Sequence, residues 1–140
     1  FLFESGSADL KQKHLKNLGR FLREIRTRYE LEGDVIRVEG HTDDVPMGKK
    51  LKYANNWELS VARATNVGVF MIEKNGYDPD LISITGHADT RPRVSYTSET
   101  GQRKLGKVLK EARKANRRVD LIFARPAASE QIRRFFPEQE

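Results

Sequence analysis

The sequence contains no cysteine, and this absence excludes disulfide bonds, thiolate metal sites and cysteine nucleophiles. Long apolar runs are also missing, since an unbroken run such as Val69 to Ile72 is far shorter than the ~20 residues that span a bilayer. No GxSxG, P-loop or GxGxxG pattern occurs, so serine hydrolases, P-loop proteins and dinucleotide-binding proteins have no support. The chain starts at Phe1 without an initiator methionine or signal peptide, and we therefore expect a fragment of a longer protein.

The residues that are present fit one folded domain. The chain has 140 residues, which falls within the usual size of a single domain of roughly 100–150 residues. A hydrophobic fraction of 37% with 33% charged residues is low but sufficient for a core, and 9% aromatic residues argue against wholesale disorder. We therefore expect one compact core.

The net charge of +6 is concentrated in one segment. Residues 103–118 carry eight bases and one acid, a net charge of +7, so the remaining 18 bases and 19 acids give −1. The lysines of this segment follow helical spacing, and no aromatic residue for base stacking occurs between Thr97 and Arg118. We expect a solvated helix face and no nucleic-acid partner; a nucleic-acid interface would instead show a steep salt dependence of DNA binding.

Strand and helix patterns alternate along the chain. Alternating apolar residues predict strands at 1–3, 35–40, 82–86 and 119–123, and three- and four-residue spacing predicts helices at 7–33, 57–74 and in the basic segment up to Ala115. Ser7 is the expected N-cap of the first helix, and Asn55 with Glu58 resembles a capping box for the second. The resulting order, β-α-β-α-β-(α)-β, predicts an α/β (α+β) fold with helices packed on a sheet.

Arg63 is the most informative residue of the second predicted helix. On a helical wheel it falls about 40° from Leu59, within an apolar stripe that also holds Phe70 and Val67. A charge in that position costs several kcal/mol unless it is paired, so a carboxylate partner is expected inside the fold, in a bound ligand, or in both. A purely structural arginine, with its stem along the core edge and its head on a structural acid, explains the same pattern.

Polar residues at the end of the second strand supply candidate partners. Asp43 opposite Arg63 would create a paired negative and positive site that suits the ammonium and carboxylate of an amino acid. A metal site is the alternative reading, because imidazole and carboxylate together suit zinc or iron, although no HExxH motif is present. The candidate metal ligands would be His41, Asp43, Asp44, His87 and Asp89.

Three motifs occur at specific spacing along the chain: Val38-Glu39-Gly40-His41-Thr42-Asp43, then Asn56-Trp57-Glu58-Leu59-Ser60 continuing to Arg63-Ala64, and Asn116-Arg117-Arg118-Val119 before the last strand. Together they resemble the OmpA-like peptidoglycan-binding domain. Phe3 followed by Gly6-Ser7-Ala8, and Asp44-Val45-Pro46, look more like the MotB branch, the flagellar stator subunits. The resemblance implies a mixed four-stranded sheet.

The resemblance also implies a set of ligand-binding residues. In that family the residues matching Asp43 and Arg63 hold the diaminopimelate residue of the peptidoglycan stem peptide, whose side chain ends in an amino acid. Thr42, Asn56 and Leu59 match further positions that line the groove, and Arg117 and Arg118 match the arginine pair before the last strand. No nucleophile or acid/base pair is evident in the sequence, so binding without catalysis is expected, with no catalytic residue, metal or cofactor.

We therefore expect residues 1–124 to form the OmpA-like domain, with a basic insertion at 93–115, and residues 125–140 to form a C-terminal extension. The resemblance implies a periplasmic wall anchor of a membrane-bound flagellar stator, a homodimer whose absent membrane helix would contact a MotA-like channel subunit. A rival of the same class is the wall anchor of an OmpA- or Pal-type outer-membrane protein or lipoprotein. A rival of another class is a metal-dependent cell-wall amidase that uses His41, Asp43, His87 and Asp89.

Overall fold

The computed structural model describes residues 3–28 and 34–125. Three helices and three strands lie in these ranges, together with a short 3-10 turn at Pro79–Leu81. The helices are α1 (Gln12–Arg28), α2 (Asn56–Asn75) and α3 (Gly106–Asn116), and the strands are β1 (Val35–Gly40), β2 (Ile82–Gly86) and β3 (Val119–Ala124). The predicted α+β class is confirmed.

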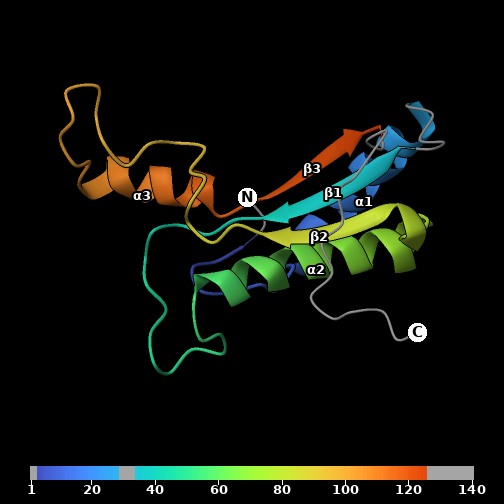
Figure 1. Cartoon of the computed structure of the whole chain (residues 1–140), viewed down its shortest axis with the longest axis horizontal. Coiled ribbons are helices and arrows are strands. Elements are labelled where there is room, and N and C mark those ends of the chain that lie inside the picture. The colour runs from blue at the N-terminus through green and yellow to red at the C-terminus, as the bar shows by residue number, and fades with distance from the viewer. Residues whose placement is uncertain (1–2, 29–33, 126–140) are drawn as a thin grey trace, which may run out of the picture.

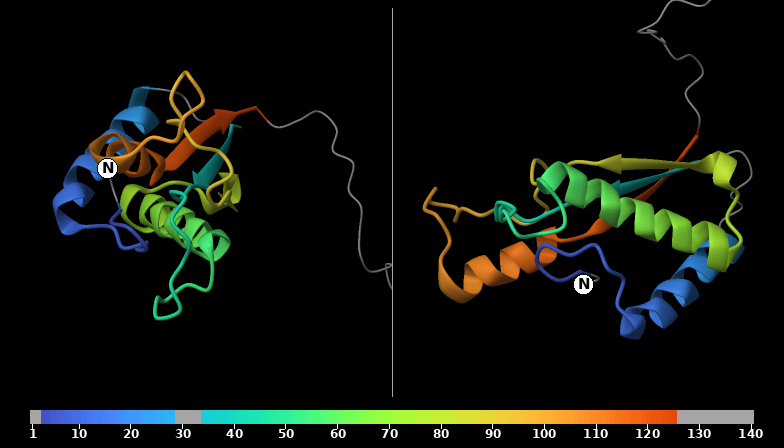
Figure 2. Two further views of the ribbon diagram at one scale, coloured as in Figure 1. Left: turned by 90° about the vertical axis from the view of Figure 1, so that its left-hand side faces the viewer. Right: turned by 90° about the horizontal axis from the view of Figure 1, so that it is seen from below.

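The three strands form one mixed sheet in the order β2-β1-β3. β1 pairs in parallel with β2 and antiparallel with β3. The C-terminal ends of β1 and β2 therefore lie at the same end of the sheet as the start of β3. Helices α1 and α2 lie on one face of the sheet, and α3 extends beyond the end at which β1 and β2 stop (Figures 1 and 2). Polar residues at that end of the sheet are thereby brought together.

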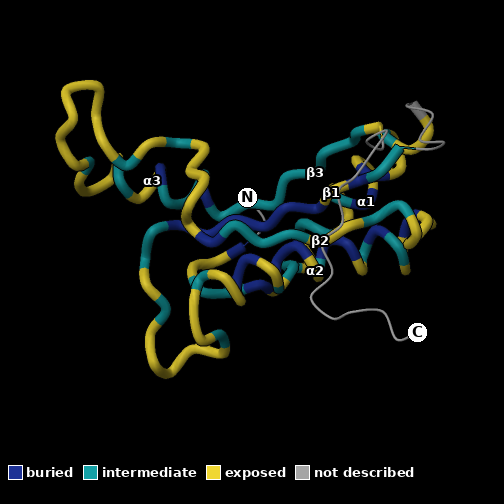
Figure 3. The backbone as a smooth tube through the Cα atoms, viewed as in Figure 1, coloured by how far each residue is buried: buried dark blue, intermediate teal, exposed yellow. Residues whose placement is uncertain are grey.

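The core lies between α2 and the central strand. Ile36 and Val38 of β1 are buried, as their alternation with polar residues predicts, and they pack with Ala64, Val67 and Met71 of α2. Leu22 of α1 completes the layer. Buried residues thus run along β1 and α2 through the middle of the molecule, and segments of exposed residues extend beyond the ends of these elements (Figure 3).

The second helix begins and ends as its sequence predicts. The side chain of Asn55 accepts a hydrogen bond from the Glu58 backbone nitrogen at 2.9 Å, and Glu58 accepts one from the Ala54 nitrogen at 2.7 Å. These reciprocal bonds satisfy donors that a helix N-terminus leaves free. At the other end, Gly76 adopts φ 70, the left-handed conformation that favours glycine.

The first helix differs from its prediction. Ser7 does not cap it: the helix starts at Gln12, and the Ser7 hydroxyl accepts a hydrogen bond from Asp9 in a local turn. The physical reason is that α2 side chains use the carbonyls of this segment, with Arg63 bonded to Ser7 and Asn66 bonded to Ala8. Residues 29–33, where the predicted C-terminus lay, are outside the described residues.

The expected mixed four-stranded sheet has three strands in the described part of the chain. Residues 1–2 of the predicted opening strand lie outside it, and Phe3 is buried in the core without forming a strand. The predicted helix in the basic segment is present as α3, preceded by an irregular hairpin in which Thr97 bridges Arg103. The C-terminal extension beyond Arg125 is also outside the described residues.

Candidate binding site

Two glycines allow the strand ends to approach α2 closely. A Cβ atom on Gly40 would lie 1.9 Å from the Ser60 carbonyl oxygen, and one on Gly86 would lie 2.5 Å from a Val61 methyl group. The backbone that follows β1 is held from both sides, because the His41 nitrogen donates to the Arg118 carbonyl and the Thr42 nitrogen to the Ala88 carbonyl. Residues 41–44 are therefore fixed next to the N-terminal half of α2.

Asp43 lies in this fixed segment and forms an ion pair with Arg117. Its Oδ2 atom is 3.0 Å from Arg117 Nη1, and its Oδ1 atom accepts a hydrogen bond from the Val45 nitrogen at 3.0 Å. Both side chains are largely buried, at 7% and 13% exposed. Arg117 also reaches the Phe3 carbonyl, so the pair connects the N-terminal segment with the residues before β3.

Arg63 is fully buried, and each of its three guanidinium nitrogens donates to a backbone carbonyl. Nε bonds Ser7 at 2.9 Å, Nη1 bonds His41 at 3.0 Å, and Nη2 bonds Glu4 at 3.0 Å. The guanidinium also lies 5.0 Å from the ring centre of Phe3. These acceptors stabilise the buried charge.

The wheel therefore predicts the burial of Arg63 correctly but not its partners. No carboxylate oxygen of the described residues lies within 4.0 Å of its guanidinium. Burial lowers the pKa of Arg63 to about 10, while the negative charge of Asp43 opposes this shift and the positive charge of Arg117 adds to it. Asp43 is thus close enough to stabilise Arg63 electrostatically. A ligand carboxylate as partner stays a prediction.

Two of the three predicted groove residues are bonded to the segment that carries Asp43. Thr42 is buried, and its hydroxyl donates to the Asp43 carbonyl at 2.9 Å. Asn56 is half-buried at the start of α2 and donates to the Val45 carbonyl at 3.1 Å. Leu59, one turn further along, is buried. This bond of Asn56 thus joins the start and the end of the loop at residues 45–55.

Arg118 lies apart from this group. Its Nε atom bonds both carboxylate oxygens of Asp120 at 3.1 and 3.2 Å, and its Nη2 atom bonds the Arg91 carbonyl. Consecutive residues entering a strand point to opposite faces, so Arg117 and Arg118 diverge. Arg117 therefore pairs with Asp43, whereas Arg118 pairs with Asp120, which supports the strand.

Asp44 contacts two bases that the sequence pattern did not connect with it. Its carboxylate binds Arg103 of the hairpin and lies 2.8 Å from Arg113 Nε of α3. Burial would raise the pKa of Asp44, but its bonds to these two arginines lower it overall. Nothing local in the sequence predicts pairs 59 and 69 residues apart.

The histidines named above as candidate metal ligands belong to a separate polar cluster. The rings of His41 and His87 stack with centroids 5.1 Å apart, His87 Nε2 lies 2.6 Å from Glu39, and His41 Nε2 lies 3.3 Å from Asp120. Burial, with the charge of Arg118, lowers the pKa of His41 to about 4. Among the described residues, no three His, Asp or Glu side chains are arranged to hold a metal ion.

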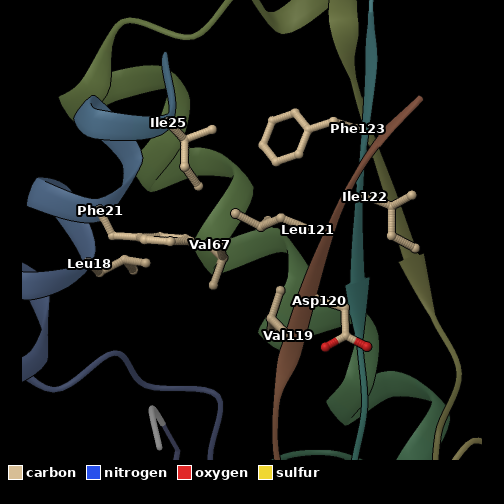
Figure 4. A pocket seen from close by; sticks show the side chains of 9 residues that line it. All are labelled: Leu18, Phe21, Ile25, Val67, Val119, Asp120, Leu121, Ile122 and Phe123. Carbon is tan, nitrogen blue, oxygen red and sulfur yellow. The ribbon is translucent and has the colours of Figure 1, made fainter. Parts of the chain in front are cut away.

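An apolar groove of about 530 Å³ lies elsewhere, between α1 and β3. Leu18, Phe21 and Ile25 face Leu121 and Phe123 across it (Figure 4). None of the seven predicted ligand-binding residues lines it. Within residues 3–28 and 34–125, no helix combines the length and apolar character needed to cross a membrane.

Fold and site together define an α+β domain with a buried acid and two arginines grouped at the edge of its sheet. The sequence matches the OmpA family over residues 2–106, and the chain belongs to that family. Its resemblance to MotB-type domains is also confirmed by solved structures. The periplasmic domain of Helicobacter pylori MotB (residues 78–256) has a TM-score of 0.71 and 27% identity, over 90% of this chain and 71% of that one.

Two curated relatives come from Bacillus subtilis (strain 168). Motility protein B is 32% identical over 95 residues, which are 68% of this chain and 32% of that protein. The uncharacterized protein YtxE is 32% identical over 122 residues, 87% of this chain and 44% of that protein. The chain therefore spans less than half the length of either. The cell wall anchor of the Pseudomonas aeruginosa type VI secretion system also resembles it, with a TM-score of 0.66 and 30% identity over 88% of this chain and 75% of that chain.

Proposed function

We propose that this domain is a non-catalytic peptidoglycan-binding module that recognises the diaminopimelate residue of the stem peptide. The observation that carries the proposal is the grouping of Asp43 with Arg117 and Arg63 beside the fixed strand end. A diaminopimelate side chain ends in an ammonium and a carboxylate, and each needs an opposite charge when it leaves water. Membership of the OmpA family and the likeness to a cell wall anchor support the same reading.

The proposed roles follow from the charges. Asp43 accepts the ligand ammonium, which replaces Arg117 Nη1 at its Oδ2 atom. Arg117 and Arg63 supply the positive charge for the ligand carboxylate. Arg117 needs only to exchange one partner, whereas direct contact with Arg63 requires the backbone at Glu4 and Ser7 to release its guanidinium.

The neighbouring residues shape the proposed site. Thr42 holds the Asp43 backbone, and Asn56 fixes the loop that follows. Leu59, buried one turn after Asn56, is proposed as the apolar lining of the groove. Arg118 matches the family position but binds Asp120, so we assign it to the support of the strand end and propose no direct contact to the ligand.

We further propose that the domain anchors a membrane-bound flagellar stator subunit to the wall from the periplasmic side, as a homodimer beside a channel-forming subunit. The likeness to MotB periplasmic domains and to Motility protein B supports this assignment. The wall anchor of an outer-membrane protein or lipoprotein uses the same kind of domain. The sequence upstream of Phe1 discriminates: one membrane helix supports the stator, and a β-barrel or lipid-modified cysteine supports the rival.

Retention on purified sacculi tests the binding proposal. Asp43→Ala and Arg63→Ala are compared with the unmodified domain and with Arg20→Ala, an exposed arginine of α1 that serves as the matched control. We expect both site variants to lose retention and the control to keep it. Circular dichroism identifies variants that fail to fold, and unchanged retention in both folded site variants would contradict the assignment.

A further inference from the structure

The positive charge of the molecule is concentrated on two segments that we call the loop arm (residues 45–55) and the helix arm (residues 93–116). Together they contain ten bases and two acids, a net charge of +8, whereas the rest of the chain has sixteen bases and eighteen acids, a net charge of −2. Both arms extend past the end of the sheet where β1 and β2 stop, and most of their surface is exposed (Figures 1 and 3).

Each arm starts and ends at the candidate site. The loop arm follows Asp44 directly and returns at Asn56, which bonds the Val45 carbonyl. The helix arm ends at Asn116, immediately before Arg117, and its first residues are tied to the same point because Asn116 Oδ1 accepts from the backbone of Arg93 and Val94. A ligand held at Asp43 therefore has a positive arm on either side of it.

Half of the basic run at 103–118 is already paired with acids at the strand ends. Arg103 and Arg113 bind Asp44, Arg117 binds Asp43, and Arg118 binds Asp120. Lys107 and Lys110 of the helix arm are different: both are exposed, and neither pairs with an acid of the described residues. The same holds for the loop-arm lysines, Lys49, Lys50 and Lys52.

We propose that these five lysines form a second binding surface, for the repeated carboxylates of the peptidoglycan polymer whose stem peptide the candidate site holds. The proposal rests on the proposed function, because it places the polymer on both sides of the stem peptide. Lysine is suited to this task, since a mobile ammonium holds repeated charges without demanding one geometry. Repeated anionic groups attract such lysines over a distance of about 10 Å at moderate salt.

Apolar side chains are exposed beside the lysines, with Leu51 50%, Leu105 74% and Val108 60% exposed. Basic and apolar residues together also suit an anionic membrane surface. The wall polymer is favoured because both arms originate at the candidate site, which a flat membrane would leave unused. Anionic vesicles are therefore the competing partner in the test.

The experiment measures binding to sacculi at several salt concentrations. One variant carries Lys107→Gln and Lys110→Gln, and another carries Lys49→Gln, Lys50→Gln and Lys52→Gln. The matched control is Lys13→Gln with Lys16→Gln on α1, which removes the same charge as the helix-arm pair from an exposed helix far along the chain. At low salt we expect each arm variant to bind about tenfold more weakly, the control to change less than twofold, and the difference to shrink at high salt.

A short soluble stem-peptide fragment separates this proposal from the proposed function. The arm variants should bind the fragment with unchanged affinity, whereas Asp43→Ala should lose it. If Asp43→Ala keeps fragment binding, the proposed function fails. The effect of the arm variants on binding to sacculi is then still interpreted on its own. Equal losses in the arm and control variants, or no loss in either, would overturn the second surface.

Two further measurements identify the partner. Sacculi treated with hydrofluoric acid lose phosphate polymers. An arm effect that persists on them assigns peptidoglycan carboxylates and supports the proposal, whereas one that disappears assigns phosphates and overturns it. Vesicles of anionic phospholipid complete the test: an arm effect seen on vesicles and absent on both kinds of sacculi would replace the wall polymer with a membrane.

Discussion

The carboxylate of Asp43 lies 3.0 Å from Nη1 of Arg117. The sequence pattern predicted Arg63 as its partner. Arg63 instead packs against the segment at residues 3–8 and donates to backbone carbonyls there. Asp43 is thus placed between a directly bonded cation and a buried one. This arrangement gives Arg63 a structural role in addition to the ligand-binding role proposed for it.

Replacing Arg63 should destabilise the fold strongly. Arg63→Met removes the donors for the carbonyls of Glu4, Ser7 and His41, which leaves one buried and two partly buried acceptors without this partner. We expect a loss of about 3–5 kcal/mol in the free energy of unfolding, measured by urea denaturation. Arg20→Met, on the exposed face of α1, should change it by less than about 0.5 kcal/mol. A similarly small effect at Arg63 would show that the three bonds contribute little.

The close approach of β1 to α2 can be tested at one glycine. Gly40→Ala places a methyl group 1.9 Å from the Ser60 carbonyl oxygen, so the helix must shift. We expect a loss of about 3 kcal/mol or more in the free energy of unfolding. Gly48→Ala is the matched control, since its nearest atom would lie 4.0 Å away. Equal stability of the two variants would mean that this contact is easily relieved.

Stability should depend on pH through His41. Its pKa falls from the ordinary 6.5 to about 4 because of burial, with Arg118 adding to the effect, Asp120 and Glu39 opposing it, and His87 lowering it slightly. Between these values the unfolded chain binds a proton that the folded protein does not. The free energy of unfolding should therefore decrease as the pH falls from about 6.5 to about 4, by up to about 3 kcal/mol.

The check is urea denaturation across that pH range for the unmodified protein and for His41→Gln. The variant should lose most of the dependence between pH 6.5 and 4. A dependence of equal size in both proteins would assign it to other groups, such as the carboxylates whose pKa values are lowered.

The attachment of the helix arm should depend on Asn116. This side chain is fully buried and bonds the backbone of Arg93 and Val94 three times. Asn116→Ala should speed hydrogen exchange at the Val94 amide at least tenfold, consistent with the roughly 1–3 kcal/mol cost of unpaired buried groups. Asn17→Ala, an exposed asparagine of α1, should leave that exchange unchanged. Unchanged exchange in Asn116→Ala would contradict the proposed attachment.

Local sequence patterns predicted the features that local physics determines. The cap at Asn55, the alternation in β1 and the apolar position of Arg63 each depend on residues within a few positions. The polar cluster after the second predicted strand supplied the strand-end acid, and the resemblance supplied the arginine pair. What neither supplied were bonds between distant segments: Asp43 with Arg117, and Asp44 with Arg113, are 74 and 69 residues apart.

The basic segment illustrates the same limit. Its net charge can be counted from the sequence. The ion pairs that its bases form with acids, however, depend on how β1, β3 and α3 pack together. The predicted start of the first helix was wrong for a related reason. Ser7 is a good N-cap by residue type, but its carbonyl accepts a hydrogen bond from Arg63 instead. Tertiary hydrogen bonds override local preference at both places.

The central claim is that opposite charges at Asp43 and its arginines recognise a zwitterionic side chain. Calorimetric titration of the domain with two stem-peptide fragments, one containing diaminopimelate and one containing lysine, tests it most directly. The lysine fragment keeps the ammonium but lacks the side-chain carboxylate, so we predict at least tenfold weaker binding, about 1.4 kcal/mol or more. Equal affinities for the two fragments would contradict the claim.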